Sequence, residues 1–191
     1  MTIKTEVSRF HIHDELTAPD GSAPLIKSIQ LAGGAVSKFL GVLAESPAAL
    51  RAYTRFRAEL HKGSLPETTR ERIGLAVAER RDDAYTLNQY ARTAKAAGLG
   101  LDEVARAREF TSSDDKEQTL LTLLKATLAY DEPVPTHLVE EAREAGWTDE
   151  QIIEAVAEMA LAQFQSLFAA AAELPLESSD PAVLQSADKA A

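Results

Sequence analysis

The chain has 191 residues, of which 45% are hydrophobic and 26% charged, as is typical of a soluble globular protein with a sizeable core. Its net charge of −10 argues against binding to nucleic acid or to an anionic membrane, because both would repel it. The lack of cysteine excludes disulfides, thiolate metal sites, iron–sulfur ligation and any thiol nucleophile. No secretory leader is visible, and no run is apolar enough to span a bilayer, so a cytoplasmic protein is expected.

The spacing of apolar and helix-capping residues predicts an all-α protein, because no strand pattern is present. We expect residues 1–21 to form an N-terminal arm, followed by short helices after Ser22 and over residues 36–45. Ser46 and Pro47 begin the next helix, since serine caps a helix and proline loses nothing in the first turn. That helix is expected to end near residue 62.

Further helices are predicted over about residues 66–81, 84–97, 101–110, 114–130 and 136–146. Asp83 fits the N-cap of the helix at 84–97. Thr148 and Gln151 form a capping box that opens a last helix, which ends near residue 173. The apolar stripe of this helix is wide, which predicts burial in the core or against another subunit. Residues 22–176 are thus expected to form one helical domain, followed by a flexible tail at 177–191.

Three segments in order along the chain carry a family resemblance. Residues 70–99 read RERIGLAVAERRDDAYTLNQYARTAKAAGL, a helix, a break and a second helix that ends at glycine. Before and after it lie TAPDGSAPLIKSIQLAGGAVSKFLGVLAESPAALRAY and DKEQTLLTLLKATLAYDEPVPTHLVEEAREAGWTDEQIIEAVAEMALAQF. Over about residues 9–176 the chain resembles the carboxymuconolactone decarboxylase / alkylhydroperoxidase-D-like (AhpD-like) superfamily, in particular its peroxidase-related branch. The resemblance implies the AhpD-like helical fold and assembly into trimers or hexamers, with sites near subunit interfaces.

The same resemblance identifies what this chain lacks. The family motif is Cys-x-x-Cys-x-x-x-His, preceded by a glutamate that acts with the histidine to deprotonate a thiol. Glu71 matches that glutamate, whereas Asp83, Thr86 and Tyr90 occupy the positions of the two cysteines and the histidine. A thiolate attacks peroxide because it is soft and ionised near neutrality, and neither a hydroxyl nor a carboxylate replaces it. A thiol peroxidase or disulfide reductase is therefore excluded.

The remaining side chains at these positions all carry oxygen. Thr86 and Tyr90 are four residues apart and share a helical face, and Asp83 lies one turn earlier. If Glu71 faces them, two carboxyls in a poorly solvated space repel each other, which raises one pKa and creates a general acid or base. Tyr90 would then donate a hydrogen bond to a developing oxyanion. The candidate catalytic residues are Glu71, Asp83, Thr86 and Tyr90, and the candidate substrate-binding residues are Tyr85, Arg70 and Arg92.

Several of these residues also have a purely structural interpretation. Glu71 suits the first turn of a helix, Asp83 suits an N-cap, and Tyr90 suits a core position with a hydrogen-bonded hydroxyl. Instead of binding an acidic ligand, the neighbouring Arg80 and Arg81 could form ion pairs with Asp82 and Asp83. No metal site is expected, because the two histidines at 11 and 13 have no matching third ligand.

Two functions stay open at this point. The first is cofactor-free proton-transfer chemistry, such as decarboxylation, isomerisation or lactone chemistry, on a small carboxylic acid. The second is a catalytically inactive family member that acts as a binding or assembly module. An enzyme is expected to show a cavity in which Glu71, Asp83 and Tyr90 converge. In a scaffold, these side chains would form ion pairs, or packed side chains would fill the space between them. Both interpretations include self-association as a trimer, a hexamer or a dimer.

Overall fold

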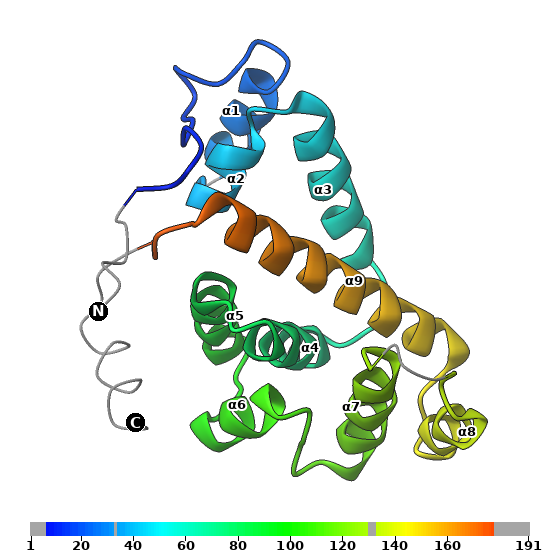
Figure 1. Ribbon diagram of the computed structural model, residues 1–191. Coiled ribbons are helices and arrows are strands. Elements are labelled where there is room, and N and C mark those ends of the chain that lie inside the picture. Colours follow the sequence, from blue (N-terminus) through cyan, green and yellow to red (C-terminus); the bar gives the residue numbers. More distant parts are fainter. Residues whose placement is uncertain (1–6, 33, 130–132, 178–191) are drawn as a thin grey trace, which may run out of the picture. The chain divides into compact units, whose positions relative to one another are not determined.

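The computed structural model describes residues 7–32, 34–129 and 133–177 (Figure 1). These residues form nine helices and no strand, which confirms the predicted all-α class. The helices are α1 (Ala23–Leu31), α2 (Lys38–Leu43), α3 (Pro47–Leu60), α4 (Glu67–Arg80), α5 (Ala84–Ala96), α6 (Leu101–Arg108), α7 (Asp115–Thr127), α8 (Thr136–Glu144) and α9 (Asp149–Ala172). The start of the predicted arm, the predicted helix end at residue 130 and all but the first residue of the predicted tail lie outside the described residues.

The helix starts follow the capping chemistry predicted from the sequence. The Asp83 carboxylate accepts hydrogen bonds from the main-chain N–H groups of Tyr85 and Thr86, at 3.1 and 3.2 Å, and so caps α5. Thr148 and Gln151 exchange side-chain to main-chain hydrogen bonds of 3.2 Å each, which is the predicted capping box of α9. These local contacts fix the starts of α5 and α9, the helices that hold Tyr90 and Glu158.

The chain divides into two compact units. The first comprises Met1–Ala52 and Phe168–Ala191, and the second comprises Tyr53–Leu167, so α3 and α9 each contribute residues to both. The prediction of one helical domain over residues 22–176 therefore stays a prediction. We describe the two units separately.

In the first unit, the chain before α1 is held by hydrogen bonds. The His13 main-chain N–H donates to the Gly41 carbonyl at 3.1 Å, and the His13 ring contacts the Glu45 carboxylate at 2.5 Å. A Cβ at Gly41 would lie only 2.8 Å from the His13 carbonyl oxygen, so this close approach requires glycine. The Arg9 main-chain N–H also donates to the Ala172 carbonyl at 2.9 Å, which ties the same segment to the end of α9.

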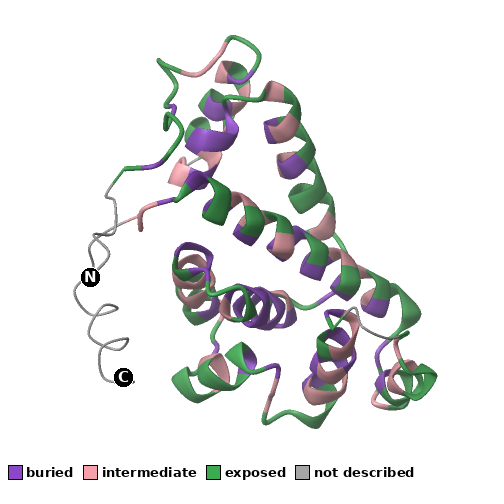
Figure 2. Cartoon of the chain, in the orientation of Figure 1, coloured by how far each residue is buried: buried purple, intermediate pink, exposed green. Residues whose placement is uncertain are grey.

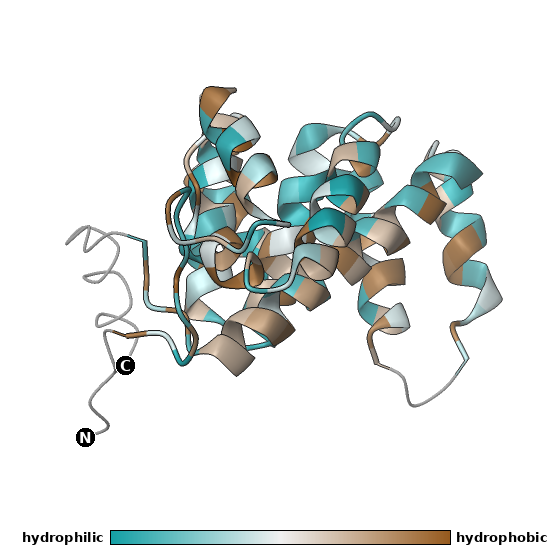
Figure 3. Ribbon diagram, turned by 90° about the horizontal axis from the view of Figure 1, so that it is seen from above, coloured by the Kyte–Doolittle hydropathy of each residue, from teal (hydrophilic) through white to brown (hydrophobic). Residues whose placement is uncertain are grey.

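In the second unit, α4 is the most deeply buried helix along its length. Every residue from Glu71 to Ala78 is buried, as the purple ribbon of α4 shows in Figure 2. Helix α4 packs against α5 and α6, and α7 packs against α8. Most helices carry both brown and teal residues in Figure 3, as expected of amphipathic helices around a core. The main apolar cluster includes Ile73, Val77, Leu120, Leu121, Leu124, Trp147, Ile152, Ala155, Met159 and Ala162.

Helix α9 is long and apolar enough, by length and composition, to pass a simple test for a membrane span. Its best 18-residue window has a mean hydropathy of 1.2, and 44% of that window is buried in the structure. The core helix of a soluble protein meets the same criteria, and the face of α9 that holds Ile152, Ala155 and Met159 packs into the main apolar cluster. A membrane span is therefore not indicated by this helix, and the cytoplasmic location stays a prediction.

Candidate functional site

Four helices of the second unit bring polar side chains into a common buried region. We call this region the carboxyl cluster, and its members are Glu71 from α4, Tyr90 from α5, Glu158 and Gln165 from α9, and Tyr53 from α3. Glu158 and Gln165 are seven residues apart, about two helical turns, so both point from the same side of α9.

Two tyrosines in the carboxyl cluster are joined through an amide. The Tyr90 hydroxyl donates to Gln165 Oε1 at 2.5 Å, and Gln165 Nε2 donates to the Tyr53 hydroxyl oxygen at 2.7 Å. The ring of Tyr90 lies directly over Gly74 of α4, because a Cβ at that position would be 2.1 Å from Tyr90 Cε1. The glycine therefore makes room for Tyr90, which the family resemblance assigns to the histidine position.

The two carboxyls of the cluster are shielded from solvent. Glu158 is 3% exposed, and its Oε2 atom has no hydrogen-bond partner among the described residues. Glu71 is 9% exposed and accepts a hydrogen bond from the Thr93 hydroxyl. Burying a carboxylate without full hydrogen bonding is costly, so both groups are expected to hold their protons more tightly than in water.

The pKa values of the two carboxyls follow from this burial. Burial raises the pKa of Glu158 to about 7, although Arg70 and Arg57 pull it down, and the negative charge of Glu71 raises it further. Burial also raises the pKa of Glu71, while the Thr93 hydrogen bond opposes the rise. The cluster therefore contains a carboxyl that exchanges its proton near neutral pH, which is the requirement for a general acid or base.

The two phenols of the cluster stay protonated. Burial, together with the charge of Glu158, raises the pKa of Tyr90 well above its ordinary value, and burial likewise raises the pKa of Tyr53. Tyr90 is thus a hydrogen-bond donor at any physiological pH and does not serve as a base.

Of the four candidate catalytic residues, two lie in the carboxyl cluster, and the other two lie at the start of α5. Glu71 and Tyr90 are members, and the negative charge of Glu71 helps to raise the pKa of Tyr90. Asp83 serves as the cap of α5, and no hydrogen bond or ion pair joins Asp83 or Thr86 to Glu71 within the described part of the chain. The Thr86 hydroxyl is buried without a hydrogen-bond partner there, and Tyr85 is buried in the first turn of α5. Convergence of all four residues on one hollow therefore stays a prediction.

Arg70 and Arg92, which were predicted to bind an acidic ligand, and the neighbouring Arg72 have different environments. Arg70 is partly buried, donates to the Leu65 carbonyl at 2.5 Å and influences the charge of Glu158. Arg72 is buried in ion pairs with Glu103 at 3.2 Å and Glu117 at 3.5 Å, so its charge is already balanced. Arg92 is exposed on α5 and forms no ion pair with the described residues.

Several members of the cluster were not identified from the sequence. Glu158 and Gln165 are polar residues within the largely apolar last helix, and the sequence around Tyr53 does not distinguish it from an ordinary apolar position of α3. A charged or amide residue on the buried face of an otherwise apolar helix requires a partner, and that criterion points to Glu158 and Gln165. No sequence pattern indicates the hydrogen bond from Thr93 to Glu71, because Thr93 is an exposed residue of α5. No group of three or more metal-binding side chains occurs in the residues that the structure covers.

Comparison with solved structures places this fold among AhpD-like proteins. A peroxidase-related protein from Silicibacter sp. TM1040 is 17% identical, with a TM-score of 0.78 over 94% of this chain and 96% of that chain. An AhpD-core peroxidase-related protein from Ralstonia eutropha JMP134 is 21% identical, with a TM-score of 0.72 over 91% and 94%. A variant of the debrominase Bmp8 in complex with 2,3,4-tribromopyrrole is 18% identical, with a TM-score of 0.69 over 85% and 89%.

The sequence comparisons agree with the structural ones. The sequence model of the carboxymuconolactone decarboxylase family matches residues 47–129, which include α4 and α5. No curated protein matches the chain. Residues 47–129 of this chain are thus similar to the carboxymuconolactone decarboxylase family, and they form part of an AhpD-like all-helical fold in a chain that contains no cysteine.

Proposed function

We propose that the carboxyl cluster carries out proton transfer on a small carboxylic acid, without a metal or a redox cofactor. The observation that supports this most directly is the buried carboxyl of Glu158, which has an oxygen without a hydrogen-bond partner in the described chain and lies within the electrostatic influence of Glu71. Two carboxyls that share a poorly solvated region do not both ionise easily, so one keeps a proton that it can transfer.

The two carboxyls are assigned different roles. Glu71 accepts the hydrogen bond from Thr93, which favours its ionised form, so we assign it as the base. Glu158 lacks such a bond on Oε2 and has a pKa of about 7, so we assign it as the acid. Tyr90 remains protonated and would turn its hydroxyl from Gln165 toward an oxyanion that forms on the substrate.

The charges around the cluster support an acidic substrate. Arg57 and Arg70 both lower the pKa of Glu158, because their positive charges stabilise a negative charge at this site. A substrate carboxylate would be attracted by the same charges, whereas the chain as a whole has a net charge of −10. The related fold of the debrominase Bmp8 was solved with a small ring compound, 2,3,4-tribromopyrrole, and a ligand of modest size is proposed here too.

A second candidate function is a catalytically inactive member that keeps the fold for binding or assembly. The packing of Tyr90 favours it, since the tyrosine ring fills the space over Gly74 and its hydroxyl is engaged by Gln165. The capping role of Asp83 also favours the inactive member, because Asp83 stabilises the start of α5 whether or not the chain is an enzyme.

Proton exchange in heavy water distinguishes the two candidates. The wild-type chain is incubated with small carboxylic acids and lactones in deuterated buffer at pH 7, and NMR follows deuterium incorporation beside the carboxyl or carbonyl carbon. Exchange that is lost in both Glu71→Gln and Glu158→Gln supports the proton-transfer proposal. Matched controls are Glu150→Gln on the first turn of α9 and Glu59→Gln on α3, both exposed. Exchange by no substrate, together with a fully folded chain, favours the inactive member.

Self-association is also part of this proposal. Ile153, Val156 and Leu167 form an exposed apolar row on α9, and Ile153 and Leu167 are 69% and 50% exposed (Figure 2, green along α9). A second copy of the chain would cover this row. Light scattering tests it, because Ile153→Lys with Leu167→Lys should reduce the molar mass to that of one chain. A wild-type chain that is already monomeric at high concentration would contradict the proposal.

A further inference from the structure

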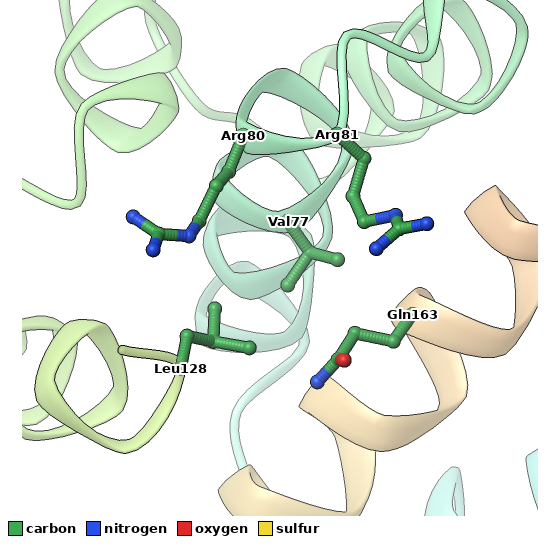
Figure 4. Close-up of a pocket in the computed structure, with 5 residues that line it drawn as sticks. All are labelled: Val77, Arg80, Arg81, Leu128 and Gln163. Atoms are coloured by element: carbon green, nitrogen blue, oxygen red, sulfur yellow. The ribbon is translucent and has the colours of Figure 1, made fainter. Parts of the chain in front are cut away.

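A pocket with a volume of about 200 Å³ lies in the second unit, beside the C-terminal end of α4 (Figure 4). Its lining residues come from three helices and their ends. They are Val77 and Arg80 on α4, Arg81 at the C-cap of α4, Leu128 at the C-cap of α7, and Gln163 on α9. In Figure 4 the guanidinium groups of Arg80 and Arg81 extend to opposite sides of Val77. The pocket therefore has an apolar floor between two cations.

This pocket is separate from the carboxyl cluster. Glu71 and Arg80 are nine residues apart on α4, about two and a half helical turns, so their side chains leave the helix on opposite sides. No member of the carboxyl cluster lines the pocket. A ligand bound here would thus not contact the carboxyls at which proton transfer is proposed.

The two arginines of the pocket are exposed, and neither has an ion-pair partner among residues 7–32, 34–129 and 133–177. Glu79 is paired with Arg108 at 2.8 Å, and Asp83 caps α5 through Oδ1 and forms no ion pair with either arginine. Within the described residues, neither Arg80 nor Arg81 forms an ion pair or a side-chain hydrogen bond, so the pairing with Asp82 and Asp83 considered from the sequence is not found. Two adjacent unpaired cations at a pocket are notable in a chain with a net charge of −10, and they indicate an anionic ligand.

We propose that this pocket binds a small organic dianion, a dicarboxylate whose two acid groups are joined by a short apolar chain. Each guanidinium takes one carboxylate through charge-assisted hydrogen bonds, which arginine forms in a two-pronged geometry. Val77 and Leu128 contact the apolar chain, and the Gln163 amide lies beside it. A pocket of about 200 Å³ suits a ligand of this size.

Calorimetric titration at low ionic strength tests the proposal, because salt weakens contacts of exposed charges. The probes are unbranched dicarboxylates from glutarate to suberate, with valerate as the monoanion and inorganic phosphate as an anion without an apolar part. At least one dicarboxylate should bind the wild-type chain more tightly than valerate or phosphate. Arg80→Gln and Arg81→Gln should each weaken that binding about tenfold. Arg55→Gln, an exposed arginine on α3 outside the pocket, should leave it unchanged.

The outcomes separate this pocket from the carboxyl cluster. Binding that is lost in Glu71→Gln but kept in both arginine variants would move the dianion to the carboxyl cluster and overturn the proposal. Equal binding of phosphate and of the best dicarboxylate would also overturn it, since the apolar floor would then contribute nothing. Absence of binding by every probe has the same consequence. The proposal does not depend on catalysis, so a chain without proton-exchange activity still tests it.

Discussion

Replacing Glu158 with glutamine is expected to stabilise the folded chain at pH 8 and to remove much of the pH dependence of its stability. The folded carboxyl has a pKa of about 7, above the ordinary value of 4.5. Below pH 4.5 the group is protonated in both the folded and the unfolded chain, so it contributes no difference. As the pH rises from 4.5 to 7, the unfolded chain releases this proton while the folded chain retains it, and the free energy of unfolding falls. Above pH 7 the loss is complete.

The size of the loss follows from the two pKa values. One pKa unit corresponds to about 1.4 kcal/mol, so the difference between 4.5 and about 7 amounts to about 3 kcal/mol at pH 8. Glutamine has nearly the same shape and carries no charge, but its amide would lack a partner where Glu158 Oε2 lacks one, at a cost of about 1 kcal/mol. The variant should therefore be about 2 kcal/mol more stable than the wild type at pH 8 and slightly less stable at pH 4.

Urea unfolding followed by circular dichroism, at pH values from 4 to 8, measures both effects. Glu71 leaves a smaller dependence of the same sign, because burial raises its pKa too. Glu150→Gln on the first turn of the same helix is the matched control, since that side chain is exposed, and its stability profile should follow the wild type. Equal slopes between pH 4.5 and 7 in the wild type and in Glu158→Gln would refute the reasoning, because the buried carboxyl would then ionise without cost.

Two further substitutions test the packing and capping on either side of the carboxyl cluster. Gly74→Ala places a Cβ 2.1 Å from the Tyr90 ring, so it should destabilise the chain by about 1–3 kcal/mol in urea unfolding. Adding Tyr90→Ala should recover part of that loss, and strictly additive losses would show that the two residues are not in contact. Asp83→Ala should lower the unfolding free energy by about 1 kcal/mol through loss of the α5 cap, whereas Asp83→Asn should be nearly neutral. Equal losses in the two Asp83 variants would indicate a role for the charge.

The fold was predictable to a large extent because its helices begin and end at residues with strong local preferences. Asp83 before α5 and the pair Thr148 and Gln151 before α9 act within a few residues of the chain, so the sequence contains the whole interaction. The order of segments around residues 70–99 then indicated the AhpD-like arrangement, which the structural comparisons bear out.

The carboxyl cluster was only half predictable, because its contacts join residues far apart in the chain. Glu71 was found through the family motif, and Tyr90 through its place at the histidine position. Glu158 comes 87 positions after Glu71, and its acidity depends on burial in the folded chain, which no local pattern encodes. Asp83 is a different case, since its Oδ1 has a local role as the cap of α5, whereas a role of this residue in catalysis stays a prediction.

The central claim is that a carboxyl buried in the folded chain exchanges its proton near neutral pH. Carbon-13 NMR of the glutamate side-chain carboxyls, followed from pH 4 to 9 under folding conditions, tests it most directly. We predict one glutamate resonance with a midpoint near pH 7 that is absent from Glu158→Gln and present in Glu150→Gln. Titration of every glutamate carboxyl below pH 5 in the folded wild-type chain would contradict the account.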